Sequence, residues 1–303
     1  MPETTPGVAA RDAAALAHDA FVQACTLDVL ARKPGNVSEA SPGHRMHAAL
    51  FIESARAAAP ALCRPGAPVG ERIEDAVRAT QRVVQCNTNL GIVLLCAPIV
   101  AAHERRAPGD ERAPLAARVR TVLDGLGVDD ARAAYRAIAL AQPAGLGSAR
   151  EQDVAAAPTV GLRAAMALAA DRDRIAFQYA HGCPDVFELG VPAFRRGEAS
   201  ARRNGDTPRA AAAHGLQCAF LEFLAAWPDS HIARKHGAAA AHSVMAEARP
   251  WRDRARRGAP FDADPDWAAW DESLKRRGLN PGTSADLCVA TALAALLEAA
   301  PAA

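Results

Sequence analysis

The segment Lys33-Pro34-Gly35-Asn36, followed by His44, combines residue types that bind phosphate groups. Only three of the 35 cationic residues in the chain are lysines, and one of them stands here. Glycine lets backbone N–H groups point at an anion, and lysine supplies a compact positive charge. The same residues also suit a helix end, where lysine lies near the negative end of the helix dipole and Pro-Gly stops the helix. The segment is a candidate phosphate site with a structural alternative.

Three short polar side chains, Asn87, Thr88 and Asn89, interrupt an apolar stretch and are followed by Gly91. Buried amide and hydroxyl groups destabilise a fold unless they form hydrogen bonds. Their partners are either another helix, in a structural network, or the base, ribose or phosphate of a nucleotide. The sequence supports the two interpretations about equally.

Carboxylates that could act as an acid, a base or a metal ligand stand in further segments. Glu198 lies in an irregular segment, and Asp229 opens the segment Asp-Ser-His-Ile-Ala-Arg-Lys, which contains Lys235. Carboxylates in such positions are usually solvated, and Asp229 is well placed to cap the helix that follows it. Each of these carboxylates therefore has a structural interpretation beside the chemical one.

The segment Asn-Pro-Gly-Thr-Ser-Ala-Asp at 280–286 predicts a helix N-terminus. Thr283 as the N-cap, with Asp286 three residues later, resembles a capping box in which Asp replaces Glu. A helix N-terminus also attracts anions, and a carboxylate there can hold a metal ion that carries phosphate. Thr283, Ser284 and Asp286 are thus cap residues or members of a nucleotide site.

Several common chemistries lack their motifs in this chain. It has no HExxH zinc motif, no GxxxxGK[ST] phosphate loop, no GxGxxG after a strand and no GxSxG elbow. Its seven cysteines are odd in number and form no CxxC pair, which is typical of thiols in a reduced compartment. A formal charge of +1 argues against nucleic-acid binding by neutralisation of many phosphates. We therefore expect a cytoplasmic protein with small-molecule partners.

Neither a membrane span nor a secretion signal is expected. The apolar stretch 90–102 is too short to cross a bilayer, and Pro98 interrupts it. The first 20 residues lack the basic and apolar regions of a signal peptide.

The elements that must position these residues are predicted to be helices. Helical periodicity recurs along the chain, and strand alternation is nearly absent. About a quarter of the residues are alanine, the best helix former and a poor strand former. These features predict an all-α, single-domain multi-helix bundle over residues 1–303. Helices are expected at 8–31, 46–62, 70–103 (one helix or two), 115–126, 129–141, 159–181, 207–227, after Asp229, and from 280 onwards.

The remaining segments are expected to be less regular. Asp129 is a plausible N-cap, and 105–114 reads as a charged loop. Residues 143–158 are expected to be irregular and 182–206 mixed. The charged, tryptophan-bearing stretch 249–277 is expected to form a solvated face or a short arm.

Five segments, in this order, resemble the triphosphoribosyl-dephospho-CoA synthase family, that is, the CitG/MdcB type and its archaeal and methylotroph relatives. The resemblance runs over nearly the whole chain. The matching segments are a Pro-Gly-x-Val loop with a following His, an Asn-Thr-x-x-Gly motif, a Gly-Val-Pro…Arg-Gly-Glu-Ala segment, an Asp-x-x-Ile segment and a Pro-Gly-x-Ser-Ala-Asp-Leu signature, found here at 34–37 with His44, 87–91, 190–199, 229–232 and 281–287.

The resemblance implies an all-α pentosyltransferase that moves a triphosphoribosyl group from ATP to 3′-dephospho-CoA and releases adenine. A ribose hydroxyl would attack C1′ of ATP, and a carboxylate or histidine would take its proton. The triphosphate would require Mg²⁺ and a cation. The resemblance makes Glu198, Asp229 and Asp286 candidates for catalysis, and Asp229 and Asp286 candidates for the metal. Candidates for binding ATP or the acceptor are Lys33, Gly35, Asn36, His44, Asn87, Thr88, Asn89, Lys235, Thr283 and Ser284.

Two departures place the chain nearer to the archaeal and methylotroph branch. Synthases of the citrate-lyase type carry His-Lys where this chain has Asn89-Leu90, and an Asp where it has Arg45. The loss of a charge-assisted contact costs about 1.5–3 kcal/mol, which is enough to change a substrate.

Two alternatives therefore stand beside the leading interpretation. One is a related nucleotide-dependent transferase in tetrahydromethanopterin-linked one-carbon metabolism, and the other is a non-catalytic helical nucleotide-binding protein. Release of adenine from ATP separates them from the synthase. A homo-oligomer is compatible with the sequence.

Overall fold

The chain folds into fourteen α-helices and one short π-helix over the residues that the computed structural model describes, 8–105, 113–143, 145, 147–149 and 151–300. Within these ranges there is no strand, and the only β-type pairing is an isolated bridge between Gly43 and Met46. The predicted all-α fold class is confirmed. The elements are α1 (Val8–Leu30), α2 (Ala48–Leu62), α3 (Val69–Val84), α4 (Leu90–Glu104), α5 (Leu115–Asp124), α6 (Val128–Ala141), α7 (Leu162–Ala167), α8 (Arg174–His181), η1 (Asp185–Gly190), α9 (Val191–Arg203), α10 (Pro208–Ala226), α11 (Ser230–His236), α12 (Ala238–Arg256), α13 (Pro265–Arg276) and α14 (Gly282–Ala299).

The chain is divided into more helices than the periodicity predicts. The stretch 70–103 is two helices, because Gln85 takes a left-handed conformation at φ +53° and ends α3. The stretch 159–181 is also two helices, α7 and α8, and 182–206 contains η1 and α9. Most of the charged loop predicted at 105–114 lies outside the described residues.

The cap of α6 differs from the prediction. The N-cap is Gly127, and its N–H donates to Asp130 Oδ2 at 3.0 Å. Asp129 lies in the first turn and pairs with Arg132 on the surface. Asp130 is the residue that satisfies the helix start, because only the third position of a helix can reach back to the N-cap N–H.

The stretch 249–277 is not an arm: it forms the end of α12 and all of α13, with a solvated outer face and a buried aromatic inner face. Trp251 on α12 and Trp267 and Trp270 on α13 form an aromatic cluster with Phe261. Trp267 is completely buried, and its ring centroid lies 5.0 Å from that of Trp251. Hydrophobic burial of these rings joins the two helices, while the many charged residues occupy their outer faces.

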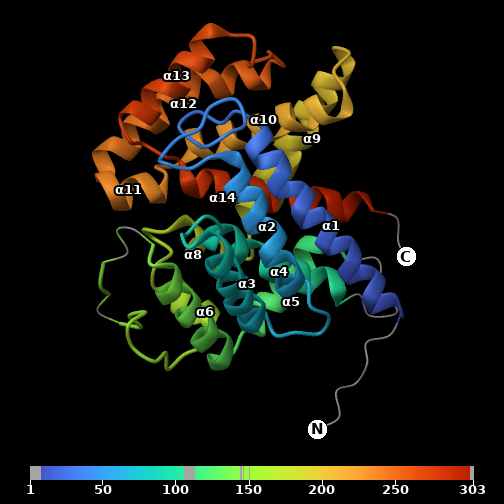
Figure 1. Cartoon of the computed structure of the whole chain (residues 1–303), viewed down its shortest axis with the longest axis vertical. Coiled ribbons are helices and arrows are strands. Elements are labelled where there is room, and N and C mark those ends of the chain that lie inside the picture. The colour runs from blue at the N-terminus through green and yellow to red at the C-terminus, as the bar shows by residue number, and fades with distance from the viewer. Residues whose placement is uncertain (1–7, 106–112, 144, 146, 150, 301–303) are drawn as a thin grey trace.

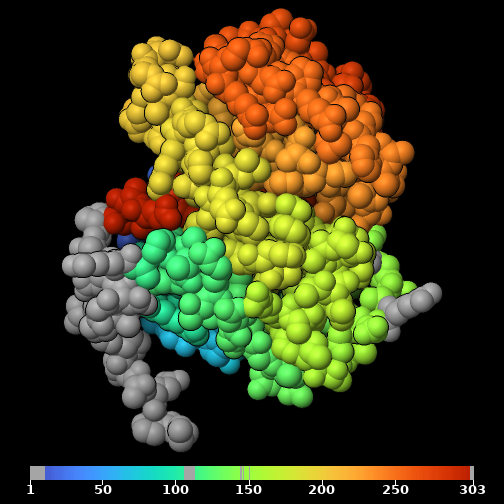
Figure 2. Space-filling view, turned by 180° about the vertical axis from the view of Figure 1, so that it is seen from behind, coloured from blue at the N-terminus to red at the C-terminus, as the bar shows by residue number. Residues whose placement is uncertain are grey.

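The helices form two groups on either side of α1 and α14 (Figure 1). In the lower group, α2 to α8, α3 packs against both α2 and α6. In the upper group, α9 to α13, α10 packs against α9 and α12. From behind, the green residues of the lower group and the yellow and orange residues of the upper group meet along one surface (Figure 2). The loop after α1 reaches the upper group, where the Lys275 ammonium donates to the Ser41 carbonyl at 2.8 Å.

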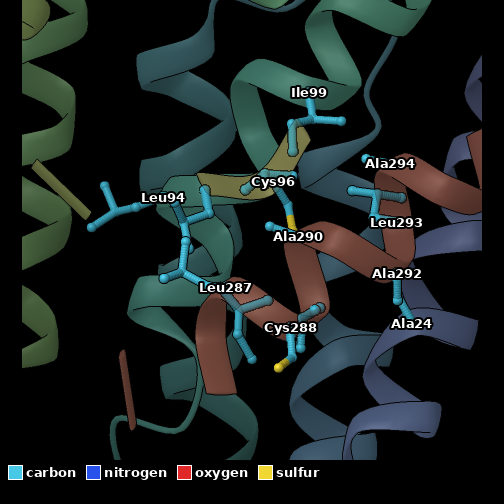
Figure 3. Close-up of a cluster of buried hydrophobic side chains, with 14 of the residues drawn as sticks. Ala24, Leu94, Cys96, Ile99, Leu287, Cys288, Ala290, Ala292, Leu293 and Ala294 are labelled. Atoms are coloured by element: carbon cyan, nitrogen blue, oxygen red, sulfur yellow. The ribbon is translucent and has the colours of Figure 1, made fainter. Parts of the chain in front are cut away.

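Helix α14 lies at the centre of the fold, against α1 and α4. Leu287, Ala290 and Leu293 on α14 are completely buried, and Cys96 of α4 lies beside Ala290 (Figure 3). By length and composition α14 is apolar enough to cross a membrane, contrary to the expectation that no stretch is. Because 72% of this stretch is buried inside the protein, its apolar character is that of a core helix.

Candidate active site

A cavity of about 590 Å³ opens between the two groups of helices. Its walls come from the end of α1 and the loop after it, one residue of α2, the start of α4, the helices α6 to α8, the described residues of 143–154, and the helices α11 and α14 near their starts. The helices α4 and α6 to α8 contribute mostly apolar side chains, whereas α1, α11 and α14 contribute carboxylates, a histidine and an arginine. The asparagine amides belong to the segments between helices, at Asn36, Asn87, Asn89 and Asn280. This volume is within the usual range for small-molecule sites, about 300–1,000 Å³.

The carboxylate of Asp286, near the start of α14, lies at the polar side of the cavity. Gly91 in the first turn of α4 makes room for it, because a Cβ there would overlap the carboxylate, with Asp286 Cγ only 2.7 Å away. Asp286 is open to the cavity but surrounded by protein, and this burial raises its pKa well above the usual range. The charges of Asp28 and Asp229 raise this pKa further, and Arg234 opposes them. The environment therefore favours the protonated acid.

A second carboxylate, Asp28 in the last turn of α1, borders the same cavity and is only 3% exposed. It forms an ion pair of 3.0 Å with the fully buried ammonium of Lys33, which also donates to the Asp28 carbonyl. Burial raises the pKa of Asp28, and the lysine charge lowers it. Asp28 thus has a dedicated counter-charge, whereas no cationic side chain of the described residues forms an ion pair with Asp286.

The loop after α1 is locked in place by contacts to the C-terminal helices. The Gly35 N–H donates to Asp271 Oδ1 at 2.8 Å, and Asn36 Nδ2 donates to Asn280 Oδ1 at 2.9 Å. His44 Nε2 lies 2.8 Å from the Gly35 carbonyl. Gly35 has φ +81°, and a Cβ there would lie 2.6 Å from the Leu279 carbonyl oxygen, so only glycine fits. Both asparagines border the cavity, whereas Gly35 and His44 support them from behind.

The polar turn before α4 is a structural network that also borders the cavity. Asn87 Oδ1 accepts from the Leu90 N–H at 3.2 Å and so satisfies the first N–H group of α4, whose N-cap is Asn89. The hydroxyl of Thr88 lies 2.6 Å from that of Ser54 on α2, and Asn89 Nδ2 donates to Thr80 Oγ1 on α3 at 2.9 Å. Their hydrogen bonds hold α2, α3 and α4 together.

Asp229 is the predicted N-cap of α11, and this prediction is confirmed. Its Oδ1 accepts from the N–H groups of His231 and Ile232 at 2.9 and 3.1 Å. Its Oδ2 accepts from the N–H and the hydroxyl of Ser284, both at 2.8 Å. The carboxylate is completely buried, so it joins α11 to α14 and has no free acceptor position for a metal.

The start of α14 differs from the expected capping box. The helix begins at Gly282, and Thr283 already lies in its first turn, so Thr283 is not the N-cap. Ser284 is bonded to Asp229, as described above, and both residues are buried without bordering the cavity.

Helix α11 places two further groups in the cavity wall, His231 and Arg234. Burial lowers the pKa of His231, and the nearby charges of Arg234 and Lys235 lower it further, against the opposing charge of Asp229. Arg234 forms an ion pair with Asp173, the N-cap of α8.

Comparison with known proteins identifies this arrangement. A family model described as ATP:dephospho-CoA triphosphoribosyl transferase, CitG, matches residues 14–302. The chain belongs to the CitG family. A solved structure from Archaeoglobus fulgidus, described as a "putative triphosphoribosyl-dephospho-coA synthase", shares the fold with a TM-score of 0.59 at 20% identity. The match covers 82% of this chain and 98% of that one. No curated protein matches the chain.

The chain is therefore a CitG-family transferase, as its motifs predicted. The structure brings five of the predicted site residues to the cavity wall, namely Asn36, Asn87, Thr88, Asn89 and Asp286. The other predicted residues do not line the cavity. Six of them lie in the protein next to the lining residues, namely Lys33, Gly35, His44, Asp229, Thr283 and Ser284, and two lie away from the cavity, Glu198 and Lys235.

Three of these placements correct the sequence interpretation. Lys33 is sealed in the interior as the partner of Asp28, so it does not meet a phosphate in the cavity. Glu198 lies on α9 and pairs with Arg202 one turn later at 2.9 Å. Lys235 is exposed on α11 and does not border the cavity.

The residues that sequence reasoning missed are Asp28, Arg234 and His231. Asp28 stands alone among apolar residues of α1, five positions before a rare lysine, and that isolation was its available signal. Arg234 and His231 stand inside the Asp229 segment, but nothing in their spacing says which side chain faces the cavity.

Proposed function

We propose that the cavity binds ATP and that a ribose hydroxyl of 3′-dephospho-CoA displaces adenine from C1′ there. The observation that carries this proposal is the pair of carboxyl groups, Asp28 and Asp286, that border one cavity in different electrostatic environments. Two carboxyl groups whose environments separate their protonation states are the usual source of an acid and a base in glycosyl transfer.

In this proposal Asp286 is the acid and Asp28 is the base. The C1′–N9 bond of ATP breaks as a bond forms between C1′ and the acceptor oxygen. Asp28, whose pKa burial raises but whose ionised form the charge of Lys33 favours, takes the proton of the hydroxyl and lies near the positive charge that develops at C1′. Asp286 donates its proton to the departing adenine, so one proton moves in net terms from the hydroxyl to the base. The proton on Asp28 returns to Asp286 before the next turnover.

The apolar side of the cavity suits the adenine ring. Its surface is formed by side chains of α4, α6, α7 and α8, which include Leu90, Ile138, Met166 and Ile175. A purine ring gains free energy there by leaving water, and Asp286 lies beside Gly91 at the edge of this surface. The arrangement places the proton donor next to the leaving group.

Magnesium fits this site as part of the substrate MgATP. Among the described residues no group of three or more His, Cys, Asp and Glu side chains is placed to hold a metal ion. Asp229, one of the two predicted ligands, has both oxygens occupied. Mg²⁺ is commonly held by substrate phosphates with one or two carboxylates, so a dedicated protein site is not required.

Incubation of the protein with MgATP and 3′-dephospho-CoA tests the proposal. Free adenine and the triphosphoribosyl adduct are followed by liquid chromatography and mass spectrometry. Asp286→Asn should lower the rate by a factor of about 10²–10⁴, the usual contribution of a general acid. Asp129→Asn, an exposed residue of α6 outside the cavity, is the matched control.

Full activity of Asp286→Asn would rule out its role as the acid. Bound ATP without release of adenine would point to another acceptor, such as that of the pterin-linked alternative.

We also propose that the enzyme works in the cytoplasm. All seven cysteines are free, and six of them are buried. Burial raises the pKa of the Cys63, Cys183 and Cys218 thiols to about 12, so they are inert thiols of the core. This usage suits a reducing compartment.

A further inference from the structure

The cavity offers few cations for a nucleotide that carries several negative charges. Among the described residues that line it, the cationic side chains are Arg172 and Arg234. Burial keeps His231 toward its neutral form by lowering its pKa. Lys33 lies in the interior and Lys235 outside the cavity, so neither lysine reaches the nucleotide from its present position.

Arg234 is held in a defined orientation. Its Nη1 forms a charge-assisted hydrogen bond with Asp173 Oδ2. Asp173 Oδ1 in turn accepts from the N–H groups of Ile175 and Ala176 at 2.9 and 3.1 Å, as the N-cap of α8. The guanidinium is therefore fixed by a carboxylate that is itself fixed to a helix.

The hydrogen bonds of Arg234 are incomplete within the described residues. Its Nε is buried and has no acceptor, and no described acceptor engages Nη2. The side chain is 23% exposed and borders the cavity. A partly buried guanidinium with an unsatisfied N–H group is costly, and an anionic ligand beside it would complete its interactions.

Arg172, the other cationic residue of the cavity, is held less firmly than Arg234. It is exposed, its Nη1 donates to the Leu168 carbonyl at 3.0 Å, and its nearest carboxylate is the exposed Asp171 at 3.6 Å. Exposed pairs of this kind contribute little and leave the side chain free to move. Arg172 can attract an anion to the entrance but does not define its position.

We propose that Arg234 binds the triphosphate of ATP and that Asp173 is its positioning residue. This inference rests on the proposed function, because it assumes that ATP occupies the cavity. A guanidinium presents two parallel N–H groups that match two phosphate oxygens, a geometry that lysine lacks. The charge of Arg234 lowers the pKa of Asp286, and a phosphate beside Arg234 would offset this effect and favour the protonated acid.

Inorganic tripolyphosphate, titrated into the protein by calorimetry, tests this assignment without turnover. Arg234→Gln should weaken its binding about tenfold to hundredfold, the range for a lost charge-assisted hydrogen bond. Arg234→Lys should recover part of the affinity, because it keeps the charge and loses the fork. Arg132→Gln, on the outer face of α6 and outside the cavity, is the matched control and should bind as the wild type does.

Adenosine, which has no phosphate, provides the second readout. Its affinity should not change in Arg234→Gln, which shows that the cavity is intact. Asp173→Asn should weaken tripolyphosphate in the same direction as Arg234→Gln, with the fold checked by circular dichroism because the N-cap of α8 is also changed. If tripolyphosphate binds Arg234→Gln as tightly as the wild type, or does not bind the wild type, the assignment is wrong.

The two proposals can fail separately. Adenine release by Arg234→Gln with an unchanged KM for ATP would overturn the role of Arg234 and leave the reaction in place. A large loss of tripolyphosphate binding in Arg234→Gln, in a protein that releases no adenine, would support Arg234 and contradict the reaction. If Lys235→Gln loses affinity for tripolyphosphate and Arg234→Gln does not, the phosphates bind outside the cavity and Arg234 is a structural residue.

Discussion

Substitution of Gly91 by alanine should displace the carboxyl group of Asp286 without changing the group itself, and so test whether its position matters for the reaction. A Cβ at residue 91 would lie 2.7 Å from Asp286 Cγ and 2.9 Å from Ile175 Cδ1. Ordinary carbon contacts begin at about 3.5 Å, so the carboxyl group must move by about 1 Å. A displacement of this size in a reacting group costs about 10²-fold in rate.

The stability of the Gly91→Ala variant should change much less than its activity. Overpacking of a tight contact costs about 1–3 kcal/mol. The gain from replacing glycine inside a helix offsets up to about 1 kcal/mol of this cost. A folded protein with strongly reduced turnover is therefore expected.

The assay is adenine release from MgATP with 3′-dephospho-CoA, with thermal denaturation run in parallel. Gly125→Ala is the matched control, because a Cβ there meets its nearest atom at 3.6 Å and the residue lies outside the cavity. A folded Gly91→Ala protein with the turnover of the wild type would show that Asp286 need not occupy its observed position, and the assignment of the acid would then fail.

Two predictions concern stability. The pKa of Asp286 is raised by burial, so above about pH 4, the range of an unfolded Asp, the folded state binds more protons than the unfolded state. The free energy of unfolding of the wild type should therefore fall relative to that of Asp286→Asn between pH 4 and pH 7 in denaturant titrations, and an equal difference at both pH values would contradict a buried acid. Lys33→Met should cost about 3–5 kcal/mol in urea unfolding, because it leaves Asp28 buried without its partner. Asp28→Asn in the same chain should recover part of this loss, and a cost below 1 kcal/mol for Lys33→Met alone would be inconsistent with the ion pair.

The helical fold was predictable because it depends on local properties. Alanine content and helical periodicity act within a few turns of chain, and the cap at Asp229 follows from side-chain chemistry near the backbone. Break points were less accessible, since Gln85 ends α3 in a conformation that glutamine rarely adopts. The burial of Trp267 was missed because the charges around it dominate the local composition.

The candidate site depends instead on contacts between distant segments. Sequence reasoning selected Asp286 as a candidate, because its segment is distinctive, and the structure places it at the cavity wall. Sequence reasoning had no means to predict that Asp28 on α1 borders the same cavity. The rarity of lysine drew attention to Lys33 as a position where a compact ammonium is needed in place of a guanidinium. The expected partner of this ammonium was a phosphate. Its partner is Asp28 within the core, not a phosphate. Arg234 and Lys235 are neighbours in sequence, and only the packing of α11 decides which one borders the cavity.

Helix α14 has a consequence for how the chain is made. Asp28 and Asp286 are about 260 residues apart in sequence. During synthesis, α1 and α4 therefore leave the ribosome long before α14, the helix that covers them in the folded protein. Until then the apolar residues around Ala24 and Leu94, which are buried in the complete fold, lack the helix that covers them. Contacts this far apart in sequence also form slowly. In the proposed mechanism the acid Asp286 lies on α14, so turnover would begin only after α14 has docked, and the appearance of activity during refolding would mark completion of the core.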